Sequence, residues 1–417
     1  MARLGGCFGL VVTALPLWLA ACGGKGTQTP YQGPNLPEPP DVPATPMDPN
    51  RPPPQLPPQS PPVASACQPE KTFVGNPIAA TPGQWTWVPF PDALCRDGTT
   101  TGIGVRLREG SNKVAIYFEG GAACFHEQSC QVNAFFQHFD ADSFKGWIGL
   151  SGNGGVFDLS KAENPFRDYS MIYVPYCTGD VHAGNREHVD VPGNAPKDQM
   201  FVGFRNVERY LQRLVPTFPK ATDVVITGVS AGGFGAALNY DHIAQAFCHS
   251  RNTLVDDSGP PMSDQYMTPC LQKRWRELWN MDVAIPDDCV GCSNADGGGL
   301  VNYFPYLVKK YPKSVLSLIS SDEDGIISTF YGYGMNDCQG LEGRSAGMSG
   351  PTYAAGLAEF RNNDLAGSPY IGSYILHSTS HTWLTGLSFY NTTVSGMALT
   401  EWVNLIINEG IATHIDP

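Results

Sequence analysis

The chain has 417 residues, of which 42% are hydrophobic, and a formal net charge of −13 at pH 7. This length and composition fit a globular protein with one large domain or two small ones. The acidic balance argues against a nucleic-acid partner, because nucleic-acid binding depends on basic patches and the sequence contains no basic block.

The N-terminus has the pattern of an export signal. Arg3 is followed by a mostly apolar stretch, Leu10 to Ala21, which is too short to span a bilayer. The stretch ends in Leu-Ala-Ala-Cys22, which resembles the bacterial lipobox, where the cysteine is lipidated and becomes the mature N-terminus. We expect a signal peptide over residues 1–21 and lipidation of Cys22, so that a membrane anchor holds an exported bacterial lipoprotein at the outer membrane or cell surface. Plain cleavage after the Ala-x-Ala pattern is the alternative.

A proline-rich linker separates the anchor from the folded body. Fifteen of the 33 residues from Pro30 to Pro62 are proline. Such a segment cannot form a core and favours a stiff polyproline II spacer. We therefore assign residues 22–66 to the anchor cysteine and linker, and residues 67–417 to one catalytic domain.

The cysteines predict a disulfide-bonded body. Of the twelve cysteines, Cys7 and Cys22 lie in the signal and the anchor. An even number of remaining cysteines in an exported chain predicts up to five disulfides. These ten are Cys67, Cys95, Cys124, Cys130, Cys177, Cys248, Cys270, Cys289, Cys292 and Cys338. The Cys289-Val-Gly-Cys292 motif could be half of a zinc site or a redox pair, but no second C-x-x-C accompanies it, which favours a structural disulfide.

The order of apolar runs predicts an α/β fold. Continuous apolar, β-branched runs, typical of strands buried on both faces, alternate with helical patterns, so we expect an α/β-hydrolase-like fold with a mainly parallel central sheet and helices on both faces. The runs are 113–118, 170–174, 223–227, 252–255, 314–319 and 370–376. The helical faces are Phe204, Val207, Leu211 and Leu214, and Leu399, Trp402, Val403, Ile406 and Ile407. Residues 260–299, with three cysteines and little strand pattern, are expected to form a disulfide-rich insertion beside the site.

The motif Gly228-Val229-Ser230-Ala231-Gly232 lies where a nucleophile would be expected. An apolar strand precedes it, and small residues able to begin a closely packed helix follow it. A strand, a tight glycine turn and a helix form the nucleophile elbow of α/β-hydrolases, with the serine exposed at the carboxyl end of the sheet.

A serine nucleophile needs a base, and the base needs an acid to orient it. In α/β-hydrolases the order along the chain is Ser, then Asp or Glu, then His. Asp324 follows the strand that ends at Ile319 and is the preferred acid; Asp322 is the second candidate, and a solvated acidic loop is the alternative interpretation. His381 is the preferred base. His377 ends a strand and could be a packed histidine, and His414 lies in the C-terminal tail.

The segment Glu119-Gly120-Gly121-Ala122-Ala123-Cys124 follows an early strand and could supply an oxyanion hole. Its small residues allow backbone N–H groups to converge on a developing negative charge, and the N–H of Ala231 would complete the set. A glycine-rich loop could instead bind phosphate, but no P-loop lysine follows this one.

Several of these motifs, in order, resemble the pectin acetylesterase family of pectin acetylesterase and Notum-like serine hydrolases. The resemblance spans residues 85–387. The matching segments are Tyr117-Phe-Glu-Gly-Gly-Ala-Ala-Cys124, Val174-Pro-Tyr-Cys-Thr-Gly-Asp180, Gly228-Val-Ser-Ala-Gly-Gly233, Asp257-Ser-Gly259, Asp324-Gly-Ile-Ile327 and Ser380-His381. Ala122 and Ala123 replace an aromatic residue often found after the glycines, on the wall that faces the acyl group.

The resemblance implies a catalytic triad of Ser230, Asp324 and His381. It also implies an oxyanion hole made by the N–H groups of Gly121, Ala122 and Ala231, and a structural role for Asp257. Asp180 and His182 line the pocket or have a structural role.

The expected function is a serine esterase that removes acetyl or short acyl groups from a polysaccharide, without a metal or cofactor. The alternatives are a lipase-like carboxylesterase for longer acyl chains and a binding protein on an inactive hydrolase scaffold.

Overall fold

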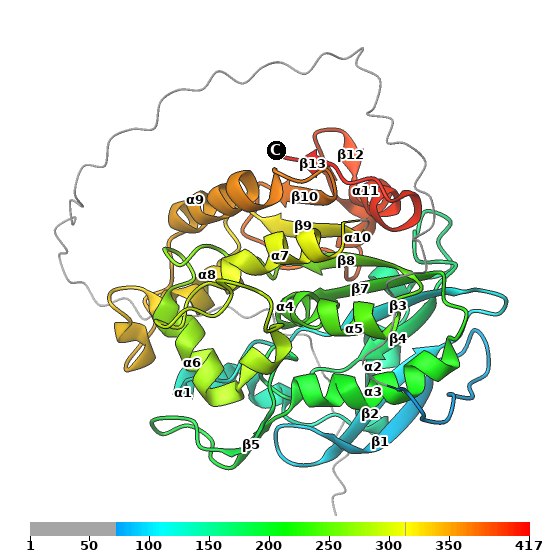
Figure 1. Cartoon of the computed structure of the whole chain (residues 1–417), viewed down its shortest axis with the longest axis horizontal. Helices are drawn as coiled ribbons and strands as arrows, with labels where there is room; N and C mark the ends of the chain where they lie inside the picture. Colours follow the sequence, from blue (N-terminus) through cyan, green and yellow to red (C-terminus); the bar gives the residue numbers. More distant parts are fainter. Residues whose placement is uncertain (1–71, 313) are drawn as a thin grey trace, which may run out of the picture. The chain divides into compact units, whose positions relative to one another are not determined.

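The computed structural model describes residues 72–312 and 314–417, so the expected signal peptide, Cys22, the linker and Cys67 lie outside the described residues. Within these ranges the main sheet has nine strands in the order β1-β2-β4-β3-β7-β8-β9-β10-β13 (Figure 1). All pairs from β4 to β13 are parallel, and β1 and β2 form an antiparallel edge. The strands are β1 (Thr86–Leu94), β2 (Thr100–Arg106), β3 (Lys113–Phe118), β4 (Ser170–Val174), β7 (Asp223–Val229), β8 (Arg251–Asp257), β9 (Val315–Ser321), β10 (Ile371–Leu376) and β13 (His414–Ile415).

All six predicted strands are present. β3 and β4 have the predicted bounds, whereas β7, β8 and β9 each continue for two residues past the predicted carboxyl end. The antiparallel strands β1 and β2 are not predicted by the sequence. They contain Pro89, Pro91, Gly102 and Gly104, and proline and glycine are tolerated at a sheet edge although they weaken the strand pattern.

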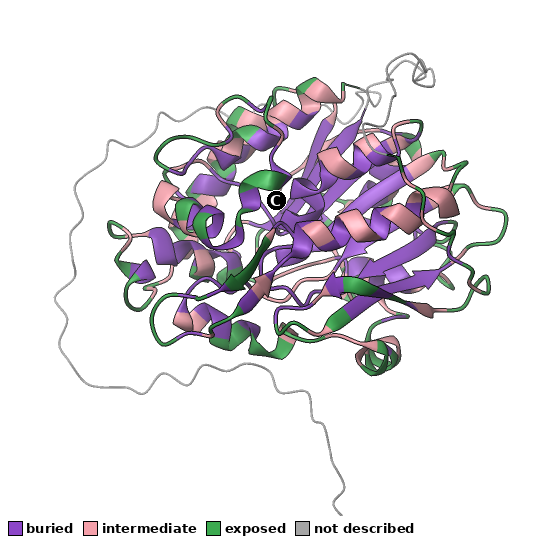
Figure 2. Ribbon diagram, turned by 60° about the horizontal axis from the view of Figure 1, so that its bottom comes forward, coloured by how far each residue is buried: buried purple, intermediate pink, exposed green. Residues whose placement is uncertain are grey.

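The sheet is buried between two helical layers, as Figure 2 shows. Alternate residues of one strand enter different cores: Ile116 and Phe118 lie in one cluster, and Ala115 and Tyr117 in the other. The first core is covered by α3 (Gly203–Thr217), α4 (Ala231–Leu238), α5 (Tyr240–Ala246), α6 (Pro269–Trp279), α7 (Tyr303–Lys310), α8 (Gly325–Tyr331) and α9 (Gly350–Phe360). The second is covered by α2 (Ala141–Leu150), α10 (Ser388–Asn391) and α11 (Leu399–Asn404). The predicted α/β fold, with helices on both faces, is confirmed.

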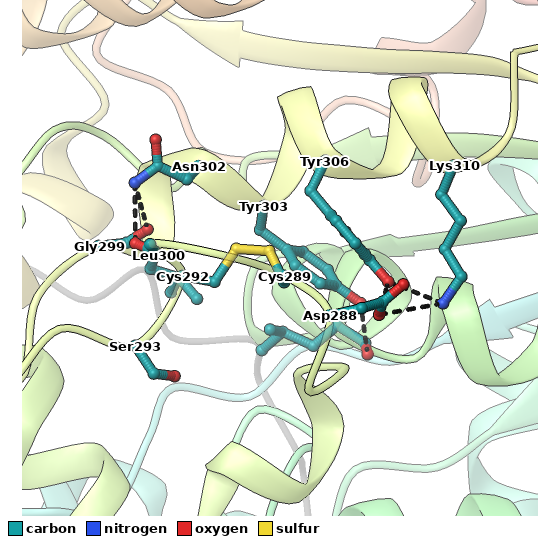
Figure 3. The surroundings of a disulfide bond; sticks show 12 residues. Asp288, Cys289, Cys292, Ser293, Gly299, Leu300, Asn302, Tyr303, Tyr306 and Lys310 are labelled. Atoms are coloured by element: carbon teal, nitrogen blue, oxygen red, sulfur yellow. Dashed lines mark hydrogen bonds and ion pairs between the residues drawn. A yellow bond between two sulfur atoms is a disulfide. The ribbon is translucent and has the colours of Figure 1, made fainter.

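The predicted insertion, residues 260–299, contains α6 and no strand. All nine cysteines among the described residues are disulfide-bonded. Four pairs are Cys95–Cys177, Cys124–Cys130, Cys270–Cys338 and Cys289–Cys292. The C-x-x-C motif thus forms a disulfide within itself, close to Tyr303 (Figure 3). Over the described residues, the helices are too short or too polar to cross a membrane.

The helix that follows Ser230 packs unusually close to the sheet. A Cβ added to Gly232 in α4 would lie 2.1 Å from the carbonyl oxygen of Phe118 at the end of β3. A contact shorter than 3 Å with backbone cannot be relieved by a side-chain rotation, so glycine at this position allows α4 to begin directly over β3.

We expect Gly232→Ala to lower the free energy of unfolding by about 1–3 kcal/mol, the usual cost of overpacking a core. Gly149→Ala in α2 is the matched control, because nothing lies within 4 Å of an added Cβ there. This control should leave stability unchanged or raise it by up to about 1 kcal/mol. Chemical denaturation measures both changes, and equal effects of the two substitutions would contradict the close packing.

Candidate active site

Ser230 lies at a sharp turn between β7 and α4. Its backbone has φ 59° and ψ −124°, a conformation that a residue with a Cβ rarely adopts. Such strain costs about 1–3 kcal/mol and persists only where the surrounding structure imposes it. The Ser230 N–H donates to the carbonyl oxygen of Asp257 at 2.8 Å. The serine is 8% exposed. The strand, the strained turn and the helix have the geometry of a nucleophile elbow.

Asp324 and His381 are brought together by the neighbouring strands β9 and β10. Asp324 is fully buried at the N-cap of α8, where Oδ1 accepts the N–H groups of Ile326 and Ile327, both at 2.9 Å. Its other oxygen, Oδ2, lies 2.7 Å from Nδ1 of His381. The backbone bonds fix the carboxylate, and the carboxylate in turn orients the imidazole.

The other imidazole nitrogen of His381 differs from Nδ1 in its contacts. Nε2 is buried and has no hydrogen-bond partner among the described residues. The Ser230 hydroxyl therefore makes no hydrogen bond with it in this structure. Catalytic hydrogen bonds are often long without substrate and tighten in the complex. Because a carboxylate accepts at Nδ1, the neutral ring carries its proton there and leaves a lone pair on Nε2.

The second candidates form a separate pair. His377 Nδ1 lies 2.7 Å from Asp322 Oδ2, which identifies Asp322 as the partner of His377 rather than of His381. The His377 side chain is 78% exposed, so the expectation of a packed histidine is wrong. Its exposure follows from its position, one residue past the end of β10. His414 is in β13, where its Nδ1 is 2.8 Å from the Ser373 hydroxyl.

The predicted oxyanion segment lies against the nucleophile. A Cβ on Gly120 would be 2.8 Å from the Cβ of Ser230, so the backbone at Gly120 lies directly against the nucleophile turn. Ala122 has φ 64°, which is uncommon for alanine and turns the chain sharply. Within the described part of the chain, the N–H groups of Gly121, Ala122 and Ala231 donate to no protein acceptor. Unused backbone donors beside a serine can bind a developing negative charge.

Two side chains that the sequence does not predict lie against the oxyanion segment. Asn133 is fully buried in the 3₁₀ helix η1 (Asn133–Phe136), and its amide donates to the Gly121 carbonyl at 2.6 Å. The rings of Phe136, from the same helix, and of Tyr176 both lie close to Gly121, where an added Cβ would be 2.8 Å from the first and 2.6 Å from the second. The only sequence signal was the nearby Cys124–Cys130 spacing, which the structure shows as a disulfide closing the loop.

Asp180 and His182 are buried below the site. Asp180 accepts the N–H of Gly203 at 2.8 Å, and His182 Nε2 is 2.8 Å from the carbonyl oxygen of Glu119. Burial raises the pKa of Asp180 to about 6 and lowers the pKa of His182 to about 4. A neutral, buried His182 can donate to Glu119 and support the end of β3, so these contacts favour the structural role.

Glu119 is an ionisable residue at the start of the oxyanion segment. Its carboxylate accepts the N–H of Tyr176 at 3.0 Å. Burial raises the pKa of Glu119 to about 7, although hydrogen bonds to the carboxylate oppose this shift.

Comparison with known proteins shows to which family the chain belongs. A profile of the pectinacetylesterase family matches residues 84–326. The chain is 31% identical to the palmitoleoyl-protein carboxylesterase notum2 of Xenopus laevis over 214 residues, which cover 47% of this chain and 42% of that protein. It is 26% identical to the human palmitoleoyl-protein carboxylesterase NOTUM, over 36% of this chain and 30% of that protein. The chain thus matches less than half of the length of these relatives.

The fold is also similar to a solved structure. The Wnt deacylase Notum from Drosophila superposes with a TM-score of 0.55 at 18% identity, over 80% of this chain and 95% of that chain. This likeness shows the α/β-hydrolase fold. With the profile match over more than half of the sequence, the chain belongs to the pectinacetylesterase family, which includes the Notum-like carboxylesterases.

Proposed function

We propose that the chain is an exported, lipid-anchored serine esterase that removes acetyl or other short acyl groups from a polysaccharide. The observation that carries the proposal is the buried Asp324–His381 hydrogen bond, on the same edge of the sheet as the strained turn at Ser230. This edge lies at the carboxyl ends of adjacent parallel strands, where α/β folds bind ligands.

In the first half of the reaction Ser230 Oγ attacks the ester carbonyl carbon. Its proton passes to Nε2 of His381, and the carbonyl oxygen becomes an oxyanion that accepts from the N–H groups of Gly121, Ala122 and Ala231. The bond to the leaving alcohol then breaks, and the imidazolium returns its proton to that oxygen. Asp324 holds the imidazole in place and stabilises the imidazolium.

In the second half a water molecule replaces the alcohol. His381 takes a proton from the water, whose oxygen attacks the acyl carbon and forms a second tetrahedral intermediate. This intermediate collapses, the bond to Ser230 Oγ breaks, and the serine recovers its proton as the carboxylic acid leaves. No step requires a metal or cofactor.

The two histidine–aspartate pairs provide a matched test. A fluorophosphonate probe should label the wild-type protein, and Ser230→Ala should abolish labelling. Asp324→Asn should slow it by about 10⁴-fold, because it stabilises the wrong tautomer, and His381→Gln should be at least as severe. Asp322→Asn, whose amide oxygen can still accept the Ser378 N–H, and His377→Gln alter the second pair, and both should label at the wild-type rate. Labelling that survives Ser230→Ala would contradict the mechanism, and an unlabelled wild type would favour a non-catalytic binding protein.

Acyl chain length separates the two esterase proposals. The phenyl ring of Phe136 lies close to Gly121 of the oxyanion segment, and a bulky neighbour there supports the proposal of a short acyl group. The names of the relatives, which include palmitoleoyl-protein carboxylesterases, favour the alternative of a longer chain. Rates on p-nitrophenyl esters should be highest for acetate and should fall with chain length. Rates that rise toward palmitate would contradict the deacetylase proposal and support the lipase-like one.

The anchor is proposed from the lipobox at Cys22, together with the disulfides, which fit an exported protein. Expressed in a bacterium with an alkyne fatty acid, the full chain should carry the label and sediment with membranes. Cys22→Ala should remove the label and release the protein. Membrane association that persists in this variant would contradict lipidation at Cys22.

A further inference from the structure

Asp257 is a fully buried carboxylate at the carboxyl end of β8, between the nucleophile and the base. One oxygen, Oδ2, accepts the N–H groups of Trp383 and Leu384 at 2.6 and 2.8 Å. The other accepts the hydroxyl of Ser258 at 3.0 Å. Both backbone donors belong to the loop that carries His381.

The same residue also contacts the nucleophile turn. The Asp257 carbonyl oxygen accepts the N–H of Ser230 at 2.8 Å. One residue therefore bonds through its main chain to the serine and through its side chain to the histidine loop. A movement of the serine turn relative to the histidine loop would disturb a hydrogen bond at Asp257.

The histidine loop needs such an anchor because its backbone is strained. Thr382, between His381 and Trp383, has φ 66°. A β-branched residue at positive φ is a genuine outlier, which the surrounding contacts must hold in place. The carboxylate of Asp257 accepts hydrogen bonds from the next two residues, Trp383 and Leu384. On the other side of the loop, the Ser321 hydroxyl donates to the Ser380 carbonyl at 2.7 Å.

We propose that Asp257 is a positioning residue for the esterase reaction, which fixes His381 relative to Ser230 by accepting two backbone hydrogen bonds from the histidine loop. The inference rests on the proposed function, since the positions matter only if serine and histidine react together. The roles of the two aspartates differ: Asp324 hydrogen-bonds the imidazole, whereas Asp257 hydrogen-bonds the backbone beyond it and the Ser258 hydroxyl.

Hydrogen bonding and charge can be separated at this position. Asp257→Asn is neutral, but its amide oxygen can still accept both N–H groups while its NH₂ donates to Ser258. Asp257→Glu keeps the charge but moves the acceptor by one methylene. Positioning predicts a kcat close to wild type for the asparagine variant. For the glutamate variant it predicts a kcat lower by on the order of 100-fold, the usual cost of misplacing a catalytic group by about 1 Å, with KM unchanged.

Asp256→Asn is the control. Asp256 is also fully buried, but it lies on the opposite face of β8, next to Gly233 and Gly259. Burial, together with the charge of Asp257, raises its pKa well above the usual range, so the neutral asparagine is close in shape to the native side chain. This variant should keep the wild-type kcat on p-nitrophenyl acetate.

Amide hydrogen exchange tests the anchor without reference to activity. The amides of Trp383 and Leu384 should be protected in the wild-type and Asp257→Asn proteins and should exchange faster in Asp257→Glu. Unchanged protection in the glutamate variant would overturn the inference. An active glutamate variant beside an inactive, folded asparagine variant would also overturn it, because charge would then be the requirement. Failure of the wild-type protein to react with fluorophosphonate would instead contradict the proposed function.

Discussion

Parallel pairing of the central strands is the constraint on which the site depends. β7, β8, β9 and β10 are adjacent and parallel, so their carboxyl ends meet at one edge of the sheet. Ser230 follows β7, Asp257 ends β8, Asp324 follows β9 and His381 follows β10. Residues spread over about 150 positions of the sequence are thereby brought to the same edge of the sheet.

Backbone N–H groups then refine positions that the strands set only coarsely. Two buried carboxylates, Asp324 and Asp257, each accept two of these donors. A buried carboxylate without such partners would be costly, so the bonds make the burial possible and also fix the direction of each side chain. Ser230, Ala122 and Thr382, all at positive φ, lie in this same region, and such strain is typical of functional sites.

Much of the fold and the chemistry could be predicted from the sequence, and the failures have physical causes. Strands buried on both faces are continuously apolar, so β3 and β4 were predicted to the residue. β1 and β2 were missed because prolines and glycines at the sheet edge hide their pattern. The sequence favours His381 because His377 ends a strand and His414 lies in the tail, but the pairing of each histidine with its aspartate depends on side-chain contacts that a sequence does not show. The contacts of Asn133, Phe136 and Asp257 cannot be predicted either, because they also depend on the positions of side chains.

The most direct test of a joint action of Ser230 and His381 is a crystal structure of the protein after reaction with a fluorophosphonate. The account predicts phosphorus bonded to Ser230 Oγ and one phosphonyl oxygen within hydrogen-bond distance of the N–H groups of Gly121, Ala122 and Ala231. It also predicts Nε2 of His381 within hydrogen-bond distance of the adduct. An adduct on another residue, or a phosphonyl oxygen directed away from these N–H groups, would contradict it.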